Sequence, residues 1–136
     1  MGEESLAGQM KLLGLVAIAG AAGSLARYGT NLLFEGHMKG FPLSTVTVNL
    51  LGCFLFGLVW ELSVGRDASS VFLGPAARVA ILTGFLGAFT TFSTFAFDCA
   101  RMVQSGAYGA LAVNLVLHNG AGVALFFLGA AAGRRA

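Results

Sequence analysis

The chain has 136 residues, of which 57% are hydrophobic and only 10% are charged, and its mean hydropathy is +0.82. A soluble domain carries about a quarter charged residues, so this composition excludes an ordinary globular domain and predicts an all-α integral membrane protein with a single domain, residues 1–136. The formal net charge of +2 comes from scattered residues, which excludes the basic patch that nucleic-acid binding needs.

Four apolar stretches are long enough to cross a bilayer, which takes about 20 helical residues. These spans are predicted at about 11–34, 41–63, 76–103 and 108–132, with residues 1–10 forming a polar tail or an interfacial turn. The first span contains small residues four apart, such as Ala19 and Gly23, which allow helices to pack closely. Arg27 lies in its last third, and a charge at that depth must reach the interface, an aqueous pocket or a partner.

The second span carries a stripe of small and polar residues at steps of four: Thr45, Asn49, Cys53 and Gly57. An asparagine inside the bilayer either bonds to a neighbouring helix or faces an aqueous path, and the stripe leaves both interpretations open. Cys53 and Cys99 fall at different depths, so we expect two free thiols.

The third span contains the least helical stretch of the chain, Gly-Phe-Leu-Gly-Ala-Phe-Thr-Thr-Phe-Ser-Thr-Phe at residues 84–95. Glycine and threonine lower helix propensity, and hydroxyls compete for backbone hydrogen bonds. We therefore predict that this helix is broken at mid-membrane. Non-helical backbone survives there only where protein buries it or where it lines a polar cavity, so the functional site is expected here. Asp98 and Arg101, three residues apart, are expected to pair near its end.

The fourth span has a second stripe at steps of four, which includes Asn114 and His118. The histidine is either a neutral side chain bonded to a neighbouring helix or part of a polar path. With four spans, both termini are expected on one side of the membrane.

The polar groups at bilayer depth are nearly all uncharged hydrogen-bond donors, and no carboxylate lies near the centre of a span. They are Thr45, Asn49, Thr90, Thr91, Ser93, Thr94, Asn114 and His118. Such donors suit a small anion that exchanges its water shell for protein partners. Aromatic ring edges are weakly positive, so Phe92 and Phe95 can contribute. One four-helix bundle has little interior to spare for a pore, so we expect a homodimer.

Three motifs in order carry a resemblance to a known family: Gly-Ser-Leu-Ala-Arg-Tyr at 23–28, Pro-Leu-Ser-Thr-Val-Thr-Val-Asn-Leu-Leu-Gly at 42–52, and the 84–95 stretch. With them the chain resembles the Fluc-type fluoride channels, the CrcB family, over essentially its whole length. The resemblance implies a passive and highly selective fluoride channel, not an enzyme, in the bacterial plasma (inner) membrane. It also implies a dual-topology antiparallel homodimer with two pores that exports cytoplasmic fluoride and protects the cell from fluoride toxicity.

The resemblance also implies roles for individual residues. Asn49, Phe92 and Phe95 become pore residues, Arg27 lies in the aqueous vestibule, and the backbone carbonyls of Gly87 and Thr90 hold a structural sodium ion (Na+) at the dimer centre. The remaining fluoride-binding candidates are Thr45, Ser93, Thr94, Asn114 and His118. The last two stand where relatives tend to carry a tyrosine and a serine, and a histidine can bring pH dependence.

Three other classes of function compete with a channel. A proton-coupled exporter needs an ionisable carboxylate within the membrane, and the acidic residues fall at or beyond the span ends. An intramembrane hydrolase would need Ser93 and His118 within hydrogen-bond reach with Asp98 behind. A packing subunit would explain the small residues but not the cluster at 84–95.

Overall fold

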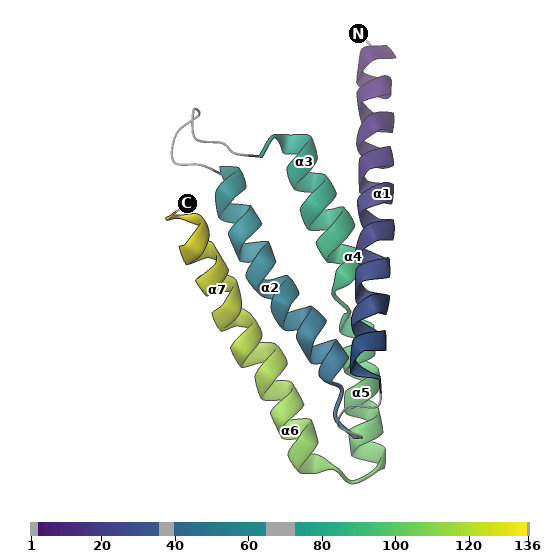
Figure 1. Ribbon diagram of the computed structural model, residues 1–136, viewed down its shortest axis with the longest axis vertical. Helices are drawn as coiled ribbons and strands as arrows, with labels where there is room; N and C mark the ends of the chain where they lie inside the picture. Colours follow the sequence, from purple (N-terminus) through teal and green to yellow (C-terminus); the bar gives the residue numbers. More distant parts are fainter. Residues whose placement is uncertain (1–2, 36–39, 65–72, 136) are drawn as a thin grey trace.

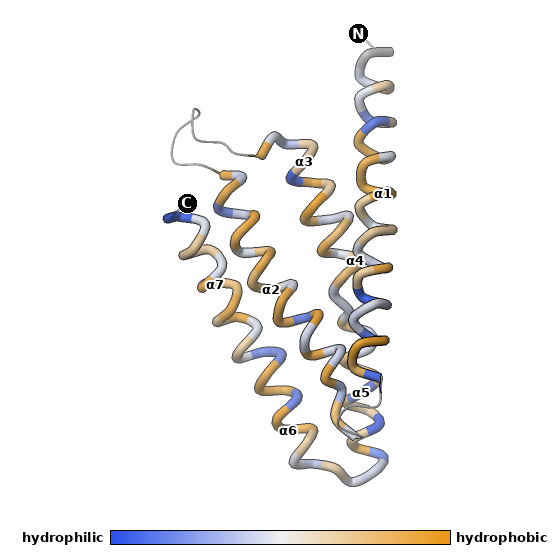
Figure 2. The backbone as a smooth tube through the Cα atoms, in the orientation of Figure 1, coloured by the Kyte–Doolittle hydropathy of each residue, from blue (hydrophilic) through white to orange (hydrophobic). Residues whose placement is uncertain are grey.

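The computed structural model describes residues 3–35, 40–64 and 73–135, and the regular structure in these ranges is helical. Four helical segments are long and apolar enough to cross a membrane: Ser5–Phe34, Leu43–Val64, Pro75–Gln104 and Tyr108–Gly133. This confirms the prediction of four apolar helices. The segments alternate in direction, so the two ends of the chain lie at the same end of the bundle (Figure 1). Hydrophilic positions interrupt the otherwise hydrophobic tubes of the second and fourth segments (Figure 2).

Helix α1 (Glu3–Phe34) is longer than predicted, because the polar stretch before Lys11 continues the helix and does not form a tail or turn. The reason is that residues 3–10 contain no proline and are rich in strong helix formers such as glutamate, leucine and alanine. The first turns of α1 stand clear of the neighbouring segments (Figure 1).

Helix α2 (Leu43–Val64) packs against α7 (Gly122–Gly133) with nearly touching backbones. A Cβ atom at Gly57 would overlap the Phe126 carbonyl oxygen, and one at Gly129 would overlap the Phe54 carbonyl oxygen. Small residues permit such close approach where lipid gives no hydrophobic drive for helix association. The glycines therefore set the distance between these two helices.

The third segment is broken, as predicted. It runs through α3 (Pro75–Val79), a π-helical stretch η1 (Ala80–Leu86) and the short α4 (Gly87–Phe89), and resumes as α5 (Phe92–Gln104). Between α4 and α5, Thr90 (ψ 158°) and Thr91 (φ −149°) have extended backbones. The part before the break packs on α1, where a Cβ at Gly84 would meet the Val16 carbonyl, whereas α5 packs on the fourth segment.

The fourth segment contains a π-helical turn that the sequence did not predict. It consists of α6 (Tyr108–Val116), η2 (Leu117–Ala121) and α7. A small apolar core formed by Val48, Leu82, Leu86 and Phe89 joins α2 to the broken segment just before the break. The core therefore holds one side of the break in place.

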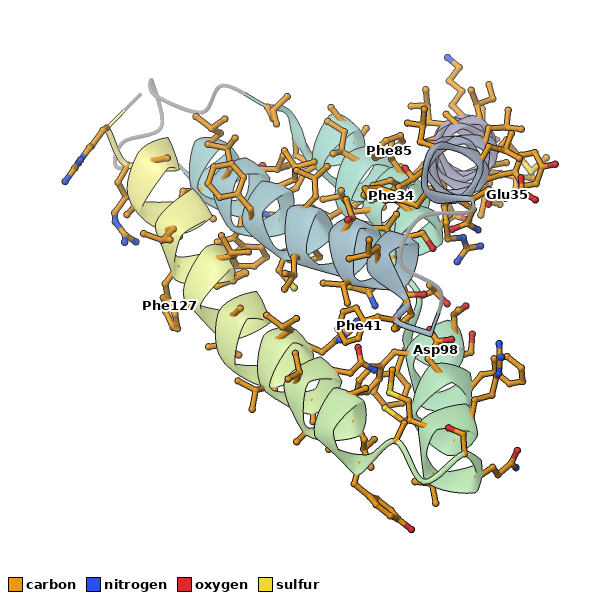
Figure 3. All side chains as sticks on the ribbon, turned by 60° about the horizontal axis from the view of Figure 1, so that its bottom comes forward. Phe34, Glu35, Phe41, Phe85, Asp98 and Phe127 are labelled. Carbon is orange, nitrogen blue, oxygen red and sulfur yellow. The ribbon has the colours of Figure 1, made fainter. Side chains whose placement is uncertain are left out.

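Asp98 and Arg101 do not form the predicted ion pair in the part of the chain that the structure describes. Thr45 of α2 donates its hydroxyl to Asp98 Oδ2 at 2.9 Å, and the Arg101 guanidinium lies 6.0 Å from the centre of the Phe97 ring. Asp98 finds a partner across the helix interface, which leaves no reason for it to bend toward Arg101. Both residues line a cavity of about 570 Å³ near Phe41 (Figure 3). The two cysteines are free, as expected.

Candidate functional site

The Asn49 side chain of α2 makes two hydrogen bonds to the backbone at the helix break. Asn49 Oδ1 accepts the backbone N–H of Thr91 at 2.7 Å, and Asn49 Nδ2 donates to the Thr91 carbonyl at 3.0 Å. The amide thus satisfies both backbone groups of a residue that has left the helix, which a buried segment requires. An asparagine amide carries two N–H donors, so one donor of Asn49 remains for another partner.

Thr91 is also the N-cap of α5. Its hydroxyl oxygen accepts the backbone N–H of Thr94 at 3.2 Å, which satisfies one of the free donors at a helix start. The same hydroxyl lies 2.9 Å from the Thr94 hydroxyl and 3.3 Å from the Ser93 hydroxyl. The hydroxyls of Thr91, Ser93 and Thr94 therefore contact one another, whereas the Thr90 hydroxyl donates to the Leu86 carbonyl at 2.9 Å.

The backbone carbonyls on the other side of the break have lost their helical donors. Because Thr91 donates its N–H to Asn49, the Gly87 carbonyl lacks the N–H that an α-helix brings from four residues later. The Thr90 carbonyl accepts Nη1 of the half-buried Arg27 at 3.3 Å. Oxygen atoms at such an unwound helix end are suited to a small cation.

A groove of about 350 Å³ lies beside the break. Its lining comes from α2, the broken segment and the fourth segment: Asn49, Gly52, Cys53, Phe56, Leu82, Leu86, Gly87, Thr90, Thr91, Phe92, Phe95, His118, Asn119 and Phe126. Three rings stand in a row along it. The Phe92 and Phe95 centroids are 5.5 Å apart with ring planes at 55°, and the Phe95 and His118 centroids are 4.3 Å apart. Phe92 is 78% exposed whereas Phe95 is buried, so the row runs from the surface inward.

His118 and Asn114 lie one turn apart, and each leaves one buried atom unpaired. His118 Nδ1 lies 3.0 Å from the Asn114 backbone carbonyl, and Asn114 Nδ2 donates to Cys99 Sγ at 3.4 Å. Among the described residues, His118 Nε2 and Asn114 Oδ1 are buried without a hydrogen-bond partner. Buried polar atoms without partners are rare, and a bound water or ion is one of the explanations for them.

The structure brings half of the eight predicted fluoride-binding residues to the groove. Asn49, Phe92, Phe95 and His118 line it. The other four do not: Thr45, Ser93, Thr94 and Asn114. Sequence reasoning missed Asn119, which lines the groove and donates to the Leu115 carbonyl at 2.8 Å. Asn119 lies in the π-helical turn η2, one residue after His118, and a pattern at steps of four passes over it.

The hydrogen bonds do not assemble a hydrolase. Ser93 lies against Thr91, Asp98 accepts from Thr45, and His118 Nδ1 is directed to its own helix. The described lining of the groove contains no acidic residue either, so it offers no carboxylate of the kind that a proton-coupled exporter uses.

Comparison with known proteins gives the same family along nearly the whole chain. The family model described as CrcB-like protein, Camphor Resistance (CrcB), matches residues 14–130. A relative from Solidesulfovibrio magneticus, named fluoride-specific ion channel FluC, is 47% identical over 92% of this chain and 98% of its own length. Proteins of the same name from Nitratidesulfovibrio vulgaris strain Miyazaki F (44% identical over 92% of this chain and 98% of theirs) and Nitrosococcus oceani (41% over 86% and 91%) are also similar. The chain therefore belongs to the CrcB family.

Proposed function

We propose that the chain is a subunit of a fluoride-specific ion channel, through which cytoplasmic fluoride leaves a bacterial cell passively across its plasma membrane. The observation that carries this proposal is the groove at the helix break, where an amide N–H and a row of ring edges meet in a chain of the CrcB family. Export of fluoride in this way protects the cell from its toxicity. The relatives compared above are named as channels for this ion.

The lining offers fluoride replacements for its water shell. The second N–H of Asn49 is free to donate after the first has bonded to Thr91. The edges of Phe92 and Phe95 carry the positive end of the ring quadrupole. A path that holds an anion only by weakly positive groups lets it leave again, which conduction requires.

The exposed side of the groove supports a homodimer. Phe92 is 78% exposed on one chain, and a wet path at this position needs protein, not acyl chains, on its open side. A second copy in antiparallel, dual-topology orientation covers two such grooves at once and gives two pores. Arg27 serves as the vestibule residue, because after one N–H has bonded to Thr90 its charge still attracts anions.

The remaining polar candidates act at the edges of this path. Thr45 has committed its hydroxyl to Asp98 beside the cavity of about 570 Å³. Ser93 and Thr94 are exposed on the first turn of α5, where a facing copy brings them beside a pore. Asn114 holds His118 in position through its backbone carbonyl.

The break also fits a structural sodium ion. The carbonyls of Gly87 and Thr90 would be its ligands, since the first has lost its helical donor and the second has a lone pair left after accepting from Arg27. Bound there, the ion would neutralise the partial negative charge at the C-terminal end of the half-helix.

Fluoride flux from liposomes tests the proposed function. Purified protein is reconstituted in vesicles loaded with potassium fluoride, and a fluoride electrode records efflux after a potassium ionophore is added to balance charge. We expect fluoride to leave much faster than it leaks from protein-free vesicles. Vesicles that contain the protein and are loaded with potassium chloride should retain their chloride. Retention of fluoride by vesicles that contain folded protein would overturn the proposal. Fluoride efflux that occurs only when a proton gradient is imposed across the vesicle membrane would indicate an exchanger.

A further inference from the structure

The hydrogen bond at His118 Nδ1 determines which form the imidazole takes at the groove. The Asn114 carbonyl oxygen, 3.0 Å away, can only accept a hydrogen bond, so Nδ1 carries the proton. A neutral imidazole has one N–H, and Nε2 is then a bare acceptor. The buried Nε2, which has no partner, therefore presents only a lone pair.

Nε2 is the unpaired acceptor on a side chain that lines the groove, whereas Asn114, whose Oδ1 is also unpaired, lies outside the lining. An anion beside the ring is repelled by the bare Nε2 while the imidazole is neutral. Protonation of Nε2 reverses this, because the ring then donates from both nitrogens and carries a positive charge. A proton on His118 therefore turns this end of the groove from repulsive to attractive for an anion.

We propose that His118 Nε2 is a fluoride subsite of the groove that exists only when the imidazole is protonated. Fluoride enters and accepts the Nε2–H hydrogen bond, and when it leaves, the proton stays on the ring. No covalent bond forms or breaks. The inference rests on the proposed function, since it concerns the ion that the groove conducts.

The surroundings make the paired form favourable. The Phe95 ring lies 4.3 Å from the imidazole, centre to centre, and an aromatic face attracts a cation. An imidazolium among apolar side chains is costly alone, and an anion that pairs with it offsets part of that cost. Fluoride is the most basic halide and accepts the strongest charge-assisted hydrogen bond, which offsets part of its larger dehydration cost relative to chloride.

No charged side chain competes for His118 among the described residues that line the groove. The titratable groups that face it are the Cys53 thiol of α2 and, through Asn114, the Cys99 thiol of α5. The broken segment and α7 contribute only apolar side chains, backbone and threonine hydroxyls. Arg27 is bonded to Thr90 and Asp98 to Thr45, and neither lines the groove. His118 is therefore the side chain on which the test is made.

The test compares fluoride efflux at pH 8 and pH 6 in symmetric buffers, after subtraction of protein-free vesicles. Imidazoles change charge between about pH 5 and 8, so the flux of the natural chain is expected to rise about tenfold as the protonated fraction rises over this range. The chain has two histidines, which gives a matched pair of variants. His37→Gln should keep the rise, and His118→Gln should abolish it.

Each result decides one question. Absence of fluoride flux at both pH values overturns the proposed function, whereas flux that is equal at both pH values overturns only the His118 subsite. A rise that persists in His118→Gln also overturns it. If this variant does not fold, fluoride is added to weakly buffered solubilised His37→Gln protein at pH 7. Uptake of protons with fluoride but not with chloride supports the subsite, and no uptake refutes it.

Discussion

Asn49 has two functions at the level of the single residue, since one amide both closes the backbone of the break and faces the groove. Its Oδ1 and one N–H are bonded to Thr91, and only the other N–H is left for an ion. An exchange of amide for carboxylate would remove both donors and add a negative charge. The position therefore tests structure and conduction together.

Asn49→Asp is expected to reduce fluoride flux by at least about tenfold, because an unpaired buried carbonyl at Thr91 costs about 1–3 kcal/mol and the new charge repels the ion. The measurement is liposome efflux with the fluoride electrode. Asn31→Asp, on the exposed face of α1, is the matched control and should conduct normally. Equal flux in the two variants would show that Asn49 does not face the path.

Phe92→Ile removes a ring edge but keeps an apolar side chain. We expect a loss of a few-fold to about tenfold in flux, if the edge contact with the ion is of the same size as an aromatic pair, about 0.5–1.5 kcal/mol. Phe97→Ile is the control, because Phe97 is also largely exposed on α5 but does not line the groove. If Phe97→Ile impaired flux and Phe92→Ile did not, the pore would run along the Phe97 side of α5, and our assignment of Phe92 to it would be wrong.

At the scale of the element, the broken segment is shared between two neighbours. Its first part lies against α1 and its second part against α6, so the extended pair Thr90 and Thr91 connects two separately packed pieces (Figure 1). Close backbone contacts hold α1 against the first part of the segment and α2 against α7, and glycines make both contacts possible.

Gly129→Ala is expected to destabilise the protein by about 1–3 kcal/mol, because the new methyl group would force the Phe54 backbone away and cores tolerate overpacking poorly. Thermal unfolding in detergent, followed by Trp60 fluorescence, measures the effect. Gly109 of α6 has open space around it, so Gly109→Ala should leave the melting temperature unchanged or raise it. A lower melting temperature for Gly109→Ala alone would contradict this account.

The sequence predicts the break but not how its polar groups are used. Low helix propensity at residues 84–95 places the break correctly, and the step of four brings Asn49 and His118 to one groove. Propensity and period cannot tell which hydroxyls bond to one another, so the sequence does not predict that Ser93 and Thr94 contact the hydroxyl of Thr91 at the cap. Their place beside the ion path stays a prediction. The π-helical stretches η1 and η2 escape because π-helices are rare and the apolar pattern of a span does not announce them.

At the scale of the whole molecule, much of the surface is apolar and only part of it can face lipid. Phe127 of α7 points away from the bundle (Figure 3), as a lipid-facing side chain would. The groove and the carbonyls at the break instead present polar atoms, which acyl chains cannot satisfy. This favours our proposal that a second copy of the chain covers them.

The proposed sodium ion predicts a salt dependence of the dimer. Replacement of sodium by N-methylglucamine should reduce the dimer fraction in detergent, because an ion present at about 100 times its Kd stabilises the form that binds it by about 2.7 kcal/mol. Light scattering coupled to size exclusion measures the fraction. Thr90→Val keeps the backbone carbonyl and should keep the dependence. A natural chain that dimerises equally without sodium would argue against the ion.

The hydrogen bonds between Asn49 and Thr91 also bear on the order in which the segments are synthesised and meet. Asn49 precedes Thr91 by 42 residues, and chains are synthesised from the N-terminus, so the acceptor and donor that the third segment needs are already in the bilayer when it leaves the ribosome. The wall that carries His118 arrives last. A nascent chain halted before the fourth segment would therefore hold a bent third segment but no finished groove.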